Sequence, residues 1–539
     1  MTAAPGAAGR PPLRVSVLSA PAPDPVALIR ALGLEGAAPL VLLDSAGGAA
    51  SLAGRHYLAW DPVFRLTVKD GRVAFAPGPA AARAGDDVAR RLAAAGPQIE
   101  RLEPFAAVRA AARLAGELTP GADPGHETGD TAGGAGPPGG AADAGASPDD
   151  IPELAALVGL VSYDAARYLE RLPDSNRDDL GLPDIDLFLP GVLLRHELDT
   201  GAAVVAERWP AEPAWTDRVA SALAAGEASP APVHGDDLPV FDSNFSRRDY
   251  QAVVARTREY VFAGDIFQAN VSQRLDVCYT LPSLHLYATL RAVNPSPFAG
   301  YLHMGDYELI SSSPERLVAL RPDGWAETRP IAGTRPRGGT TGEHSQQAAG
   351  GGVIGVAPGR EDDELAGELN LDPKERAEHV MLVDLERNDL GKVCEYGTVR
   401  VSELMVNEYY SHVIHIVSNV RGRLRPEKDG VDLLAAMFPG GTITGCPKVR
   451  CMEIIDELET VRRGPYTGSF GWLALDALDM NIIIRTLVRV GDRLYLQVGG
   501  GIVADSVPGN EYFETLHKAT GMLRAVAASI AERPGPERA

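Results

Sequence analysis

Cysteine is scarce in this sequence of 539 residues, and the four present, Cys278, Cys394, Cys446 and Cys451, show no Cys-X-X-Cys spacing. That spacing is typical of zinc and redox sites, so we predict neither and expect a reduced compartment, with the cytoplasm as the default. Residues 1–12 are rich in Ala, Pro and Gly and lack the apolar core of a signal peptide. We therefore predict a disordered tail there and no export.

Long apolar runs are also missing. No stretch approaches the roughly 18 to 20 apolar residues that span a bilayer, so no membrane association is predicted. Basic residues are outnumbered, with 51 Lys and Arg against 72 Asp and Glu, which gives a formal charge of -21. Because nucleic acids bind to basic patches, they are poor partners for this chain. An anionic substrate would need local cations, backbone amides and a metal.

Two segments have a composition that opposes folding. Gly, Ala, Pro and Asp dominate residues 116–150, and a second Gly-rich segment covers residues 338–359. Such segments bury too little apolar surface to offset their ordering entropy, so we predict two insertions, the first of them disordered. The first interrupts an N-terminal region, 13–235, and the second a C-terminal region, 236–533. A tail, 534–539, follows.

The most informative stretch runs from Phe438 to Lys448 (FPGGTITGCPK). Its three glycines and two prolines cannot sit inside a helix or a central strand, so it predicts a rigid turn that displays hydroxyls and one cation. Residue types that bind anions follow it. A helix is predicted over 449–459, and the residues that can bind anions come after it. They are Arg462-Arg463-Gly464-Pro465-Tyr466, Arg485 at the end of a predicted strand, and Gly499 to Gly501.

Local signals define several elements upstream. Ser246 with Asp249 forms a variant capping box, and Gly264 is a suitable C-terminal cap, so a helix is predicted between them. Residues 267–277 alternate apolar and polar types, which indicates a strand with one polar face. A short strand over 308–310 precedes Ser-Ser-Ser-Pro-Glu, which places Glu315 on a turn where its carboxyl can be aimed.

Two predicted helices each carry a pair of carboxylates. Glu375 and Glu378 are three residues apart, as are Glu511 and Glu514, so each pair shares a helix face. With about 100 degrees per residue, Lys518 falls on the same stripe as the second pair. Two pairs facing each other would need a cation between them. Carboxylates with water suit Mg²⁺, a hard ion that prefers oxygen ligands.

Taken together, these segments resemble chorismate-utilising enzymes: anthranilate synthase component I, aminodeoxychorismate synthase component I, and the isochorismate and salicylate synthases. The resemblance implies an α+β fold, a large antiparallel β sandwich with helices packed outside. It also implies that Glu378 and Glu514 ligate Mg²⁺ directly, while Glu375 and Glu511 hold metal-bound waters.

The resemblance implies roles for the other positions as well. Glu315 matches an acid that protonates the departing C4 hydroxyl of chorismate, a poor leaving group. Arg485 and Tyr466 match residues that clamp the enolpyruvyl carboxylate. The Mg²⁺ and the backbone amides of Gly499, Gly500 and Gly501 would face the ring carboxylate. Thr442 matches a hydroxyl that lines the ring pocket, and His415 matches an active-site histidine. Beside these matches, we expect Lys518 to add charge near the metal and Lys448 to add positive field at the ring pocket.

Three positions bear on which reaction is catalysed. Gln268 stands where isochorismate and salicylate synthases have a lysine, which argues against activation of water. Ala332 stands where many aminodeoxychorismate synthases have a lysine that attacks C2, and alanine cannot be a nucleophile. Anthranilate synthases carry Ala at this position. Other positions oppose the evidence of Ala332, because Asn270 and several glycine-rich segments from Gly440 onwards look more like aminodeoxychorismate synthase.

We therefore predict amination of chorismate to 4-amino-4-deoxychorismate, feeding 4-aminobenzoate and folate synthesis. The alternative is anthranilate synthase component I, which adds ammonia at C2 and eliminates pyruvate for tryptophan synthesis. A non-enzymatic alternative is a chorismate-binding regulatory or scaffold protein. No glutamine amidotransferase cysteine signature is visible, so ammonia is expected from a separate amidotransferase subunit, in a heterodimer, or from solution.

Overall fold

The computed structural model describes residues 13–19, 24–47, 54–119, 151–209, 211, 213–226, 238–337, 360–409 and 413–532. The predicted tails, 1–12 and 534–539, and the Gly-rich insertion 338–359 lie outside these ranges. Helix α4 continues through Glu117, so the predicted start of the first insertion at residue 116 is wrong. The apolar spacing of this helix extends to Leu118, which is buried in the core. Residues 120–150 lie outside the described ranges.

The strands of the described chain are β1 (Leu13–Ser19), β2 (Leu40–Asp44), β3 (Arg55–Lys69), β4 (Arg72–Pro77), β5 (Leu157–Val161), β6 (Ile185–Glu197), β7 (Ala202–Arg208), β8 (Asp242–Ser243), β9 (Gln268–Cys278), β10 (Phe298–His303), β11 (Tyr307–Ser313), β12 (Arg316–Leu320), β13 (Trp325–Thr328), β14 (Ile331–Pro336), β15 (Arg400–Tyr409), β16 (Val413–Arg423), β17 (Gly445–Cys446), β18 (Ser469–Leu473), β19 (Leu478–Asn481), β20 (Thr486–Val490) and β21 (Arg493–Ile502).

The helices of the described chain are α1 (Pro25–Ala31), α2 (Pro79–Arg83), α3 (Asp86–Ile99), α4 (Pro104–Glu117), α5 (Trp215–Ala225), α6 (Arg247–Ala263), α7 (Ser283–Val293), α8 (Arg360–Leu371), α9 (Pro373–Gly391), α10 (Gly430–Met437), α11 (Lys448–Leu458) and α12 (Pro508–Ala531). None of these helices combines the length and apolar character that crossing a bilayer would take.

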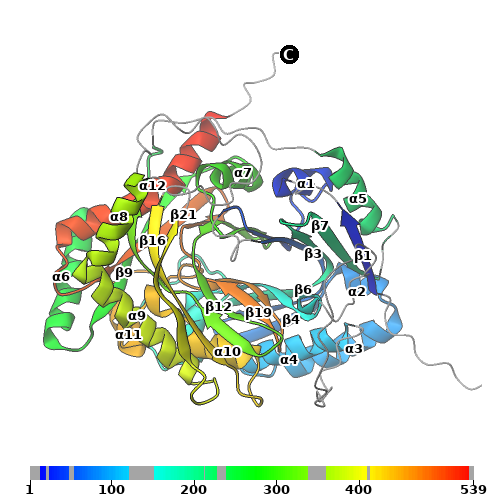
Figure 1. Cartoon of the computed structure of the whole chain (residues 1–539). Helices are drawn as coiled ribbons and strands as arrows, with labels where there is room; N and C mark the ends of the chain where they lie inside the picture. Colours follow the sequence, from blue (N-terminus) through cyan, green and yellow to red (C-terminus); the bar gives the residue numbers. More distant parts are fainter. Residues whose placement is uncertain are drawn as a thin grey trace, which may run out of the picture.

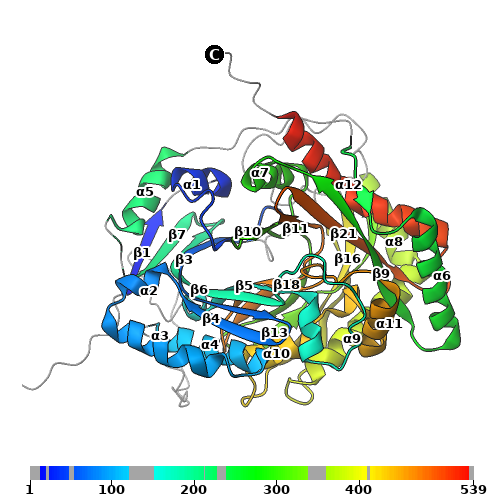
Figure 2. The same ribbon diagram turned by 180° about the vertical axis from the view of Figure 1, so that it is seen from behind.

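The described strands join into one continuous sheet with antiparallel ladders. In both ribbon views the sheet doubles over, so that two layers face each other and helices cover their outer surfaces (Figures 1 and 2). One apolar cluster, which includes Leu160, Phe188 and Leu302, lies between the layers. Two more lie beneath the helices, one under α3, α4 and α10 and the other under α1, α5, α7 and α12. The predicted α+β sandwich is therefore confirmed.

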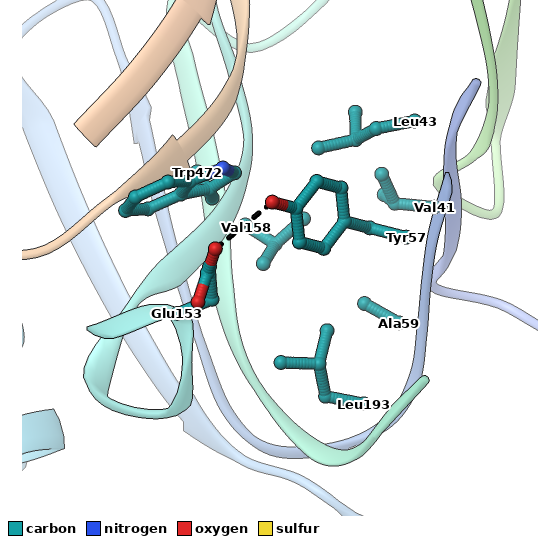
Figure 3. A pocket seen from close by; sticks show the side chains of 8 residues that line it. All are labelled: Val41, Leu43, Tyr57, Ala59, Glu153, Val158, Leu193 and Trp472. Atoms are coloured by element: carbon teal, nitrogen blue, oxygen red, sulfur yellow. Dashed lines mark hydrogen bonds between the residues drawn. The ribbon is translucent and has the colours of Figure 1, made fainter. Parts of the chain in front are cut away.

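A cavity lies between the two layers, and none of the predicted site residues lines it. Tyr57 points toward Trp472 and Glu153 across this space (Figure 3). The Tyr57 hydroxyl donates to Oε1 of Glu153 at 2.9 Å, so the one buried acid in the lining is already paired. The cavity is part of the packing between layers, and the predicted site lies elsewhere.

The predicted local signals explain the elements next to the site. The Ser246 side chain caps α6 by accepting from the Asp249 amide, and Gly264 ends the helix in the left-handed conformation. The polar-faced strand is β9, which pairs with β21 on one side and with β17 on the other. Helix α12 packs against β21, and α9 packs against β14 and β16. Strand β9 therefore lies at the centre of the predicted site.

Candidate active site

The Phe438 to Lys448 segment forms the tight, irregular connection that its glycines and prolines predict. It leaves α10, makes a short 3-10 turn over Gly441–Ile443, pairs with β9 through β17 and enters α11. A Cβ added at Gly441 would collide with Leu385 of α9, so the segment is held close against that helix. The segment thus links α9 to β9.

The Lys448 side chain has a structural partner. Its Nζ forms an ion pair with Asp389 of α9 at 2.5 Å and donates to the Met437 carbonyl oxygen at 3.0 Å. These contacts fasten the end of the segment to α9 and α10. The predicted positive field of Lys448 is therefore largely offset by the Asp389 carboxylate.

Glu315 lies on the turn between β11 and β12, as predicted, and is only 5% exposed. Burial raises the pKa of its carboxyl to about 7, and the Thr442 hydroxyl, the Ile331 amide and the Arg485 guanidinium oppose this rise. The Thr442 hydroxyl is buried close to the carboxyl but has no well-aligned hydrogen bond in the described part of the chain. Glu315 can therefore carry a proton near neutral pH, as a general acid must.

Arg485 does not end a strand, which corrects the sequence-based expectation. It precedes β20 with φ of +49°, in the left-handed region that is uncommon for residues other than glycine. Its carbonyl oxygen accepts from the Ser312 amide at 3.0 Å, so pairing across β11 and β20 continues to this point. The left-handed turn fixes the direction in which the guanidinium leaves the sheet.

His415 lies on β16 and is 2% exposed. Its Nδ1 donates to the Gly333 carbonyl oxygen at 3.2 Å, which leaves Nε2 as the unprotonated nitrogen. Burial, with a contribution from the Arg485 charge, lowers the pKa of this imidazole to about 3. Arg485 acts on both His415 and Glu315, so the structure brings these three predicted residues together around a neutral imidazole.

The triple glycine lies in β21, where it pairs with the Asn270 to Ser272 part of β9. A Cβ at Gly499 would lie 2.9 Å from the Tyr466 hydroxyl oxygen, and one at Gly501 would collide with the Gln268 amide. A Cβ at Gly500 would instead meet the acid stripe of α12, where its nearest atoms would be Oε2 of Glu511 at 3.6 Å, Oε1 of Glu514 at 3.8 Å and Nζ of Lys518 at 3.9 Å. The glycines therefore allow predicted site residues from separate segments to approach one strand.

The carboxylates of α9 lie at the β9 side of this strand. The Gln268 side chain donates from Nε2 to Oε1 of Glu378 at 3.0 Å. Oε2 of Glu375 lies 3.1 Å from the position of a Cβ on Gly333, next to Ala332 in β14. Ala332 is 7% exposed, so it borders the same region without offering a reactive group.

The carboxylates of α12 differ in exposure. Glu511 is 8% exposed, whereas the Glu514 side chain is about half exposed (51%) and forms an ion pair with Lys518 at 2.9 Å. Lys518 also donates to the Gly499 carbonyl oxygen at 3.2 Å. This cation is therefore held between the acid stripe and the glycine strand.

The carboxylates of α9 and α12 are a possible donor set for a metal ion. Four carboxylates from α9 and α12 are oxygen ligands of the kind that Mg²⁺ prefers. Within the described ranges, no three Asp, Glu, His or Cys side chains are gathered closely enough to hold an ion as they stand. The chemistry of the set fits a hard cation, and Mg²⁺ remains a prediction.

Arg462 and Arg463 have structural roles, which corrects their expected part in anion binding. Arg462 pairs with Asp174 at 2.8 Å. Arg463 is 3% exposed, pairs with Glu459 at 2.7 Å and donates to the Asn270 carbonyl oxygen at 2.6 Å. The buried pair therefore ties the end of α11 to β9, beside the site.

Replacing Arg463 by Met is expected to destabilise the protein by about 3 to 5 kcal/mol, because Glu459 would keep a buried charge without its partner. Urea denaturation measures this cost. The double variant with Glu459→Leu should recover much of the loss, since it removes both charges. A cost below about 1 kcal/mol for the single variant would contradict the buried pair.

Tyr466 follows this pair and is 8% exposed. Burial raises the pKa of its phenol, so the hydroxyl stays protonated and can donate. Tyr466 offers a buried donor beside Gly499 of the glycine strand, while Glu315 with Arg485 offers a protonated acid beside a cation. Such an arrangement is typical of an enzyme site that binds a small anion and protonates it.

The chain belongs to the family of chorismate binding enzymes, whose pattern matches residues 126–524. Anthranilate synthase component 1 of Thermus thermophilus is 45% identical over 395 residues, 70% of this chain and 79% of that protein. Aminodeoxychorismate synthase component 1 of Bacillus subtilis is 43% identical over 392 residues, 70% of this chain and 77% of that protein.

Solved structures agree with this assignment. The crystal structure of anthranilate synthase component I from Streptococcus pneumoniae superposes with a TM-score of 0.65 at 29% identity, covering 88% of this chain and 92% of the other. The menaquinone-specific isochorismate synthase of Escherichia coli superposes with a TM-score of 0.62 at 18% identity, over 96% of this chain and 95% of the other. The second likeness concerns the fold alone.

Proposed function

We propose that this protein aminates chorismate with ammonia, and that Glu315 protonates the C4 hydroxyl as it leaves. The observation that carries this proposal is the buried Glu315 carboxyl, whose pKa of about 7 keeps a proton available near neutral pH. An exposed glutamate would be ionised there and could not assist a leaving hydroxide. The nearby Arg485 offers a fixed positive charge to one of the substrate carboxylates.

Substrate binding is assigned to the glycine strand and its neighbours. Tyr466 and Arg485 would clamp the enolpyruvyl carboxylate, while the Gly499–Gly501 backbone and Lys518 would meet the ring carboxylate. The close approach of Tyr466 to Gly499 and of Gln268 to Gly501 supports this assignment, because a Cβ on either glycine would collide with these side chains. Thr442 would line the ring, and neutral His415 would offer a lone pair at Nε2.

Gly501→Ala is expected to weaken chorismate binding about tenfold or more. The added Cβ would displace the Gln268 side chain, which donates to the Glu378 carboxylate, and hydrogen bonds to charged groups contribute about 1.5 to 3 kcal/mol. The change in KM measures this loss. Gly367→Ala in α8 is the matched control, since nothing lies within 4 Å of its Cβ position. Equal KM values for the two variants would contradict the assignment.

We further propose that Mg²⁺ is the cofactor, with Glu378 and Glu514 as direct ligands and Glu375 and Glu511 holding bound waters. When bound, the ion supplies positive charge that offsets the ring carboxylate of the substrate. In the structure, the Gln268 side chain donates to the Glu378 carboxylate, and Lys518 forms an ion pair with Glu514. Ion binding would bring a stronger partner to both acids.

The proposed product is 4-amino-4-deoxychorismate, a precursor of 4-aminobenzoate and folate. Ala332 is buried at the site and cannot form a covalent bond with C2, so ammonia would have to act by direct attack, or water would replace the lysine. The same alanine favours a second candidate, anthranilate with release of pyruvate. Relatives named for each reaction have similar identity to this chain, so the product must be measured.

Ammonia is proposed to come from a glutamine amidotransferase subunit. Both relatives carry the designation component 1, which is that of one part of a multi-component enzyme. The proposed partner would dock to form a heterodimer, in the cytoplasm. The free state of all four cysteines is consistent with a reduced compartment.

Product analysis tests the proposal. The protein is incubated with chorismate, Mg²⁺ and ammonium, and the products are identified by mass and fluorescence. Aminodeoxychorismate, which an added lyase converts to 4-aminobenzoate, is the expected result. Anthranilate would establish the second candidate. Consumption of chorismate without either amine would overturn the proposed amination.

A further inference from the structure

The N-terminal part of α9, which carries Glu375 and Glu378, rests on the sheet through a buried histidine. Between Pro373 and Met381, His379 is fully buried, whereas the other side chains that the structure describes there are partly or fully exposed. Glu375 and His379 are four residues apart, so they share the helix face that packs against β14 and β16. An apolar residue would serve for packing alone, so a histidine at this position calls for another explanation.

The His379 ring is joined to the sheet by a hydrogen bond. Its Nε2 and the Oγ of Ser418 in β16 lie 2.5 Å apart. Ser418 is also fully buried, and its Oγ accepts from the Met405 amide of β15 at 2.9 Å. One hydroxyl therefore connects α9 to β15 as well as to its own strand. A hydrogen bond has a preferred direction and length, so it fixes the helix on the sheet more closely than apolar contact does.

Ser418 lies where the pairing of β16 is irregular on both sides. The register with β15 shifts between Glu403 and Val406, and Met405 within this bulge has a φ of +54°, in the left-handed region. On the other side, the Ser418 amide donates to the Pro330 carbonyl oxygen at 3.3 Å, between β13 and β14. Bulges and strained residues cluster next to active sites, where they re-aim side chains. The bulge therefore suits a position that supports a functional site.

The same part of α9 reaches the candidate site. Oε2 of Glu375 lies 3.1 Å from the position of a Cβ on Gly333, in the neighbouring strand β14. Glu378, one residue before His379, accepts from the Gln268 side chain of β9 at 3.0 Å. A shift of α9 on the sheet would move both acids relative to these strands. The placement of the two carboxylates thus depends on how the helix is held.

We propose that His379, held by Ser418, is a positioning residue that sets Glu375 and Glu378 for the binding of a divalent cation. Neither His379 nor Ser418 touches the ion or the substrate, and both act through the helix. Partners outside the ligand shell contribute about 10- to 100-fold to metal affinity, because they orient the ligands. The role of His379 rests on the proposed Mg²⁺ site and on the function that this site serves.

Four variants separate the hydrogen bond from packing. Ser418→Ala removes the hydroxyl, and His379→Leu keeps an apolar side chain without a polar atom. His379→Gln keeps a side-chain nitrogen that can meet the hydroxyl. Ser529→Ala is the matched control, because Ser529 is also fully buried and its Oγ accepts from the Tyr279 hydroxyl at 3.1 Å. Ser529 lies near the C-terminal end of α12, whereas the acids of this helix lie near its start.

Binding of Mn²⁺, followed by electron paramagnetic resonance without substrate, is a readout that does not need turnover. Mn²⁺ shares the preference of Mg²⁺ for oxygen ligands. We expect the Kd to rise about tenfold or more in Ser418→Ala and His379→Leu, and to stay near the wild-type value in His379→Gln and Ser529→Ala. Equal Kd values for Ser418→Ala and Ser529→Ala would overturn the proposal. So would a His379→Gln protein that binds as weakly as His379→Leu.

Steady-state rates distinguish the positioning role from the proposed function. In Ser418→Ala the Mg²⁺ concentration for half-maximal rate should rise about tenfold, while the rate at saturating Mg²⁺ should stay close to that of the wild type. An active Ser418→Ala with the wild-type Mg²⁺ dependence would overturn the positioning role and leave the function intact. Weaker Mn²⁺ binding by Ser418→Ala, in a protein that makes no amine, would refute the function alone. A wild type that binds no Mn²⁺ would overturn the metal site, and the role of His379 with it.

Discussion

Glu315→Gln is expected to lower kcat for chorismate consumption by about 10² to 10⁴-fold, the usual contribution of a positioned general acid. The amide matches the carboxyl in shape but has no proton to give to the leaving C4 hydroxyl. The wild-type enzyme should in turn lose activity as pH rises above about 7. The proton-bearing form of an acid is present below its pKa, and burial raises the pKa of Glu315 to about 7.

Steady-state rates with ammonium as the amine source measure this effect without a partner subunit. Thermal unfolding of the same variant is the control, because removing a buried carboxyl should not destabilise the fold. If Glu315→Gln retains more than about a tenth of the wild-type kcat, another group must protonate the hydroxyl. The pH profile of that variant would then show whether the limb above pH 7 belongs to Glu315.

Glu514→Gln is expected to abolish turnover, with a loss of at least about 100-fold in kcat/KM. Substitutions outside the ligand shell already cost about 10- to 100-fold in metal affinity or activity, and a direct ligand should cost more. The fold should be unaffected. Glu514 is half exposed, and its ion pair with Lys518 lies at the surface, where such pairs contribute little to stability.

Asp384→Asn is the matched control for Glu514→Gln. Asp384 lies on α9, its side chain is 63% exposed, and it pairs with Arg387 rather than with any site residue. Rates are measured over a range of Mg²⁺ concentrations. The rate should depend less on Mg²⁺ in Glu514→Gln than in the wild type, whereas Asp384→Asn should keep the wild-type dependence. Unchanged turnover in Glu514→Gln would remove the metal assignment.

The parts of the site that depend on short-range geometry were predictable from the sequence. Helical spacing placed Glu375 with Glu378, and Glu511 with Glu514, because three residues in a helix return to one face. A turn after a short strand placed Glu315, and this requires only a proline and the strand before it. The glycines explained how distant segments meet at β21, although only the fold shows which segments these are.

The features that sequence patterns missed depend on long-range packing. The backbone of Arg485 is in the left-handed conformation at the point where pairing between β11 and β20 continues up to it. No local sequence pattern encodes this pairing. Arg463 forms an ion pair with Glu459. A count of positive charges in the sequence cannot reveal this pair. Glu386 lies among charged residues in α9 and would be expected on the surface. Its burial becomes visible only when the segment around Gly441 packs against the helix.

Calorimetric titration of chorismate into the protein, with and without Mg²⁺, tests the central proposal most directly. Chorismate carries two carboxylates and this chain has a formal charge of -21, so binding should need the cation. We expect a heat of binding that appears or grows strongly when Mg²⁺ is present. Equal heats in both titrations, or no heat in either, would contradict a metal-assisted chorismate site and favour a regulatory or scaffold protein.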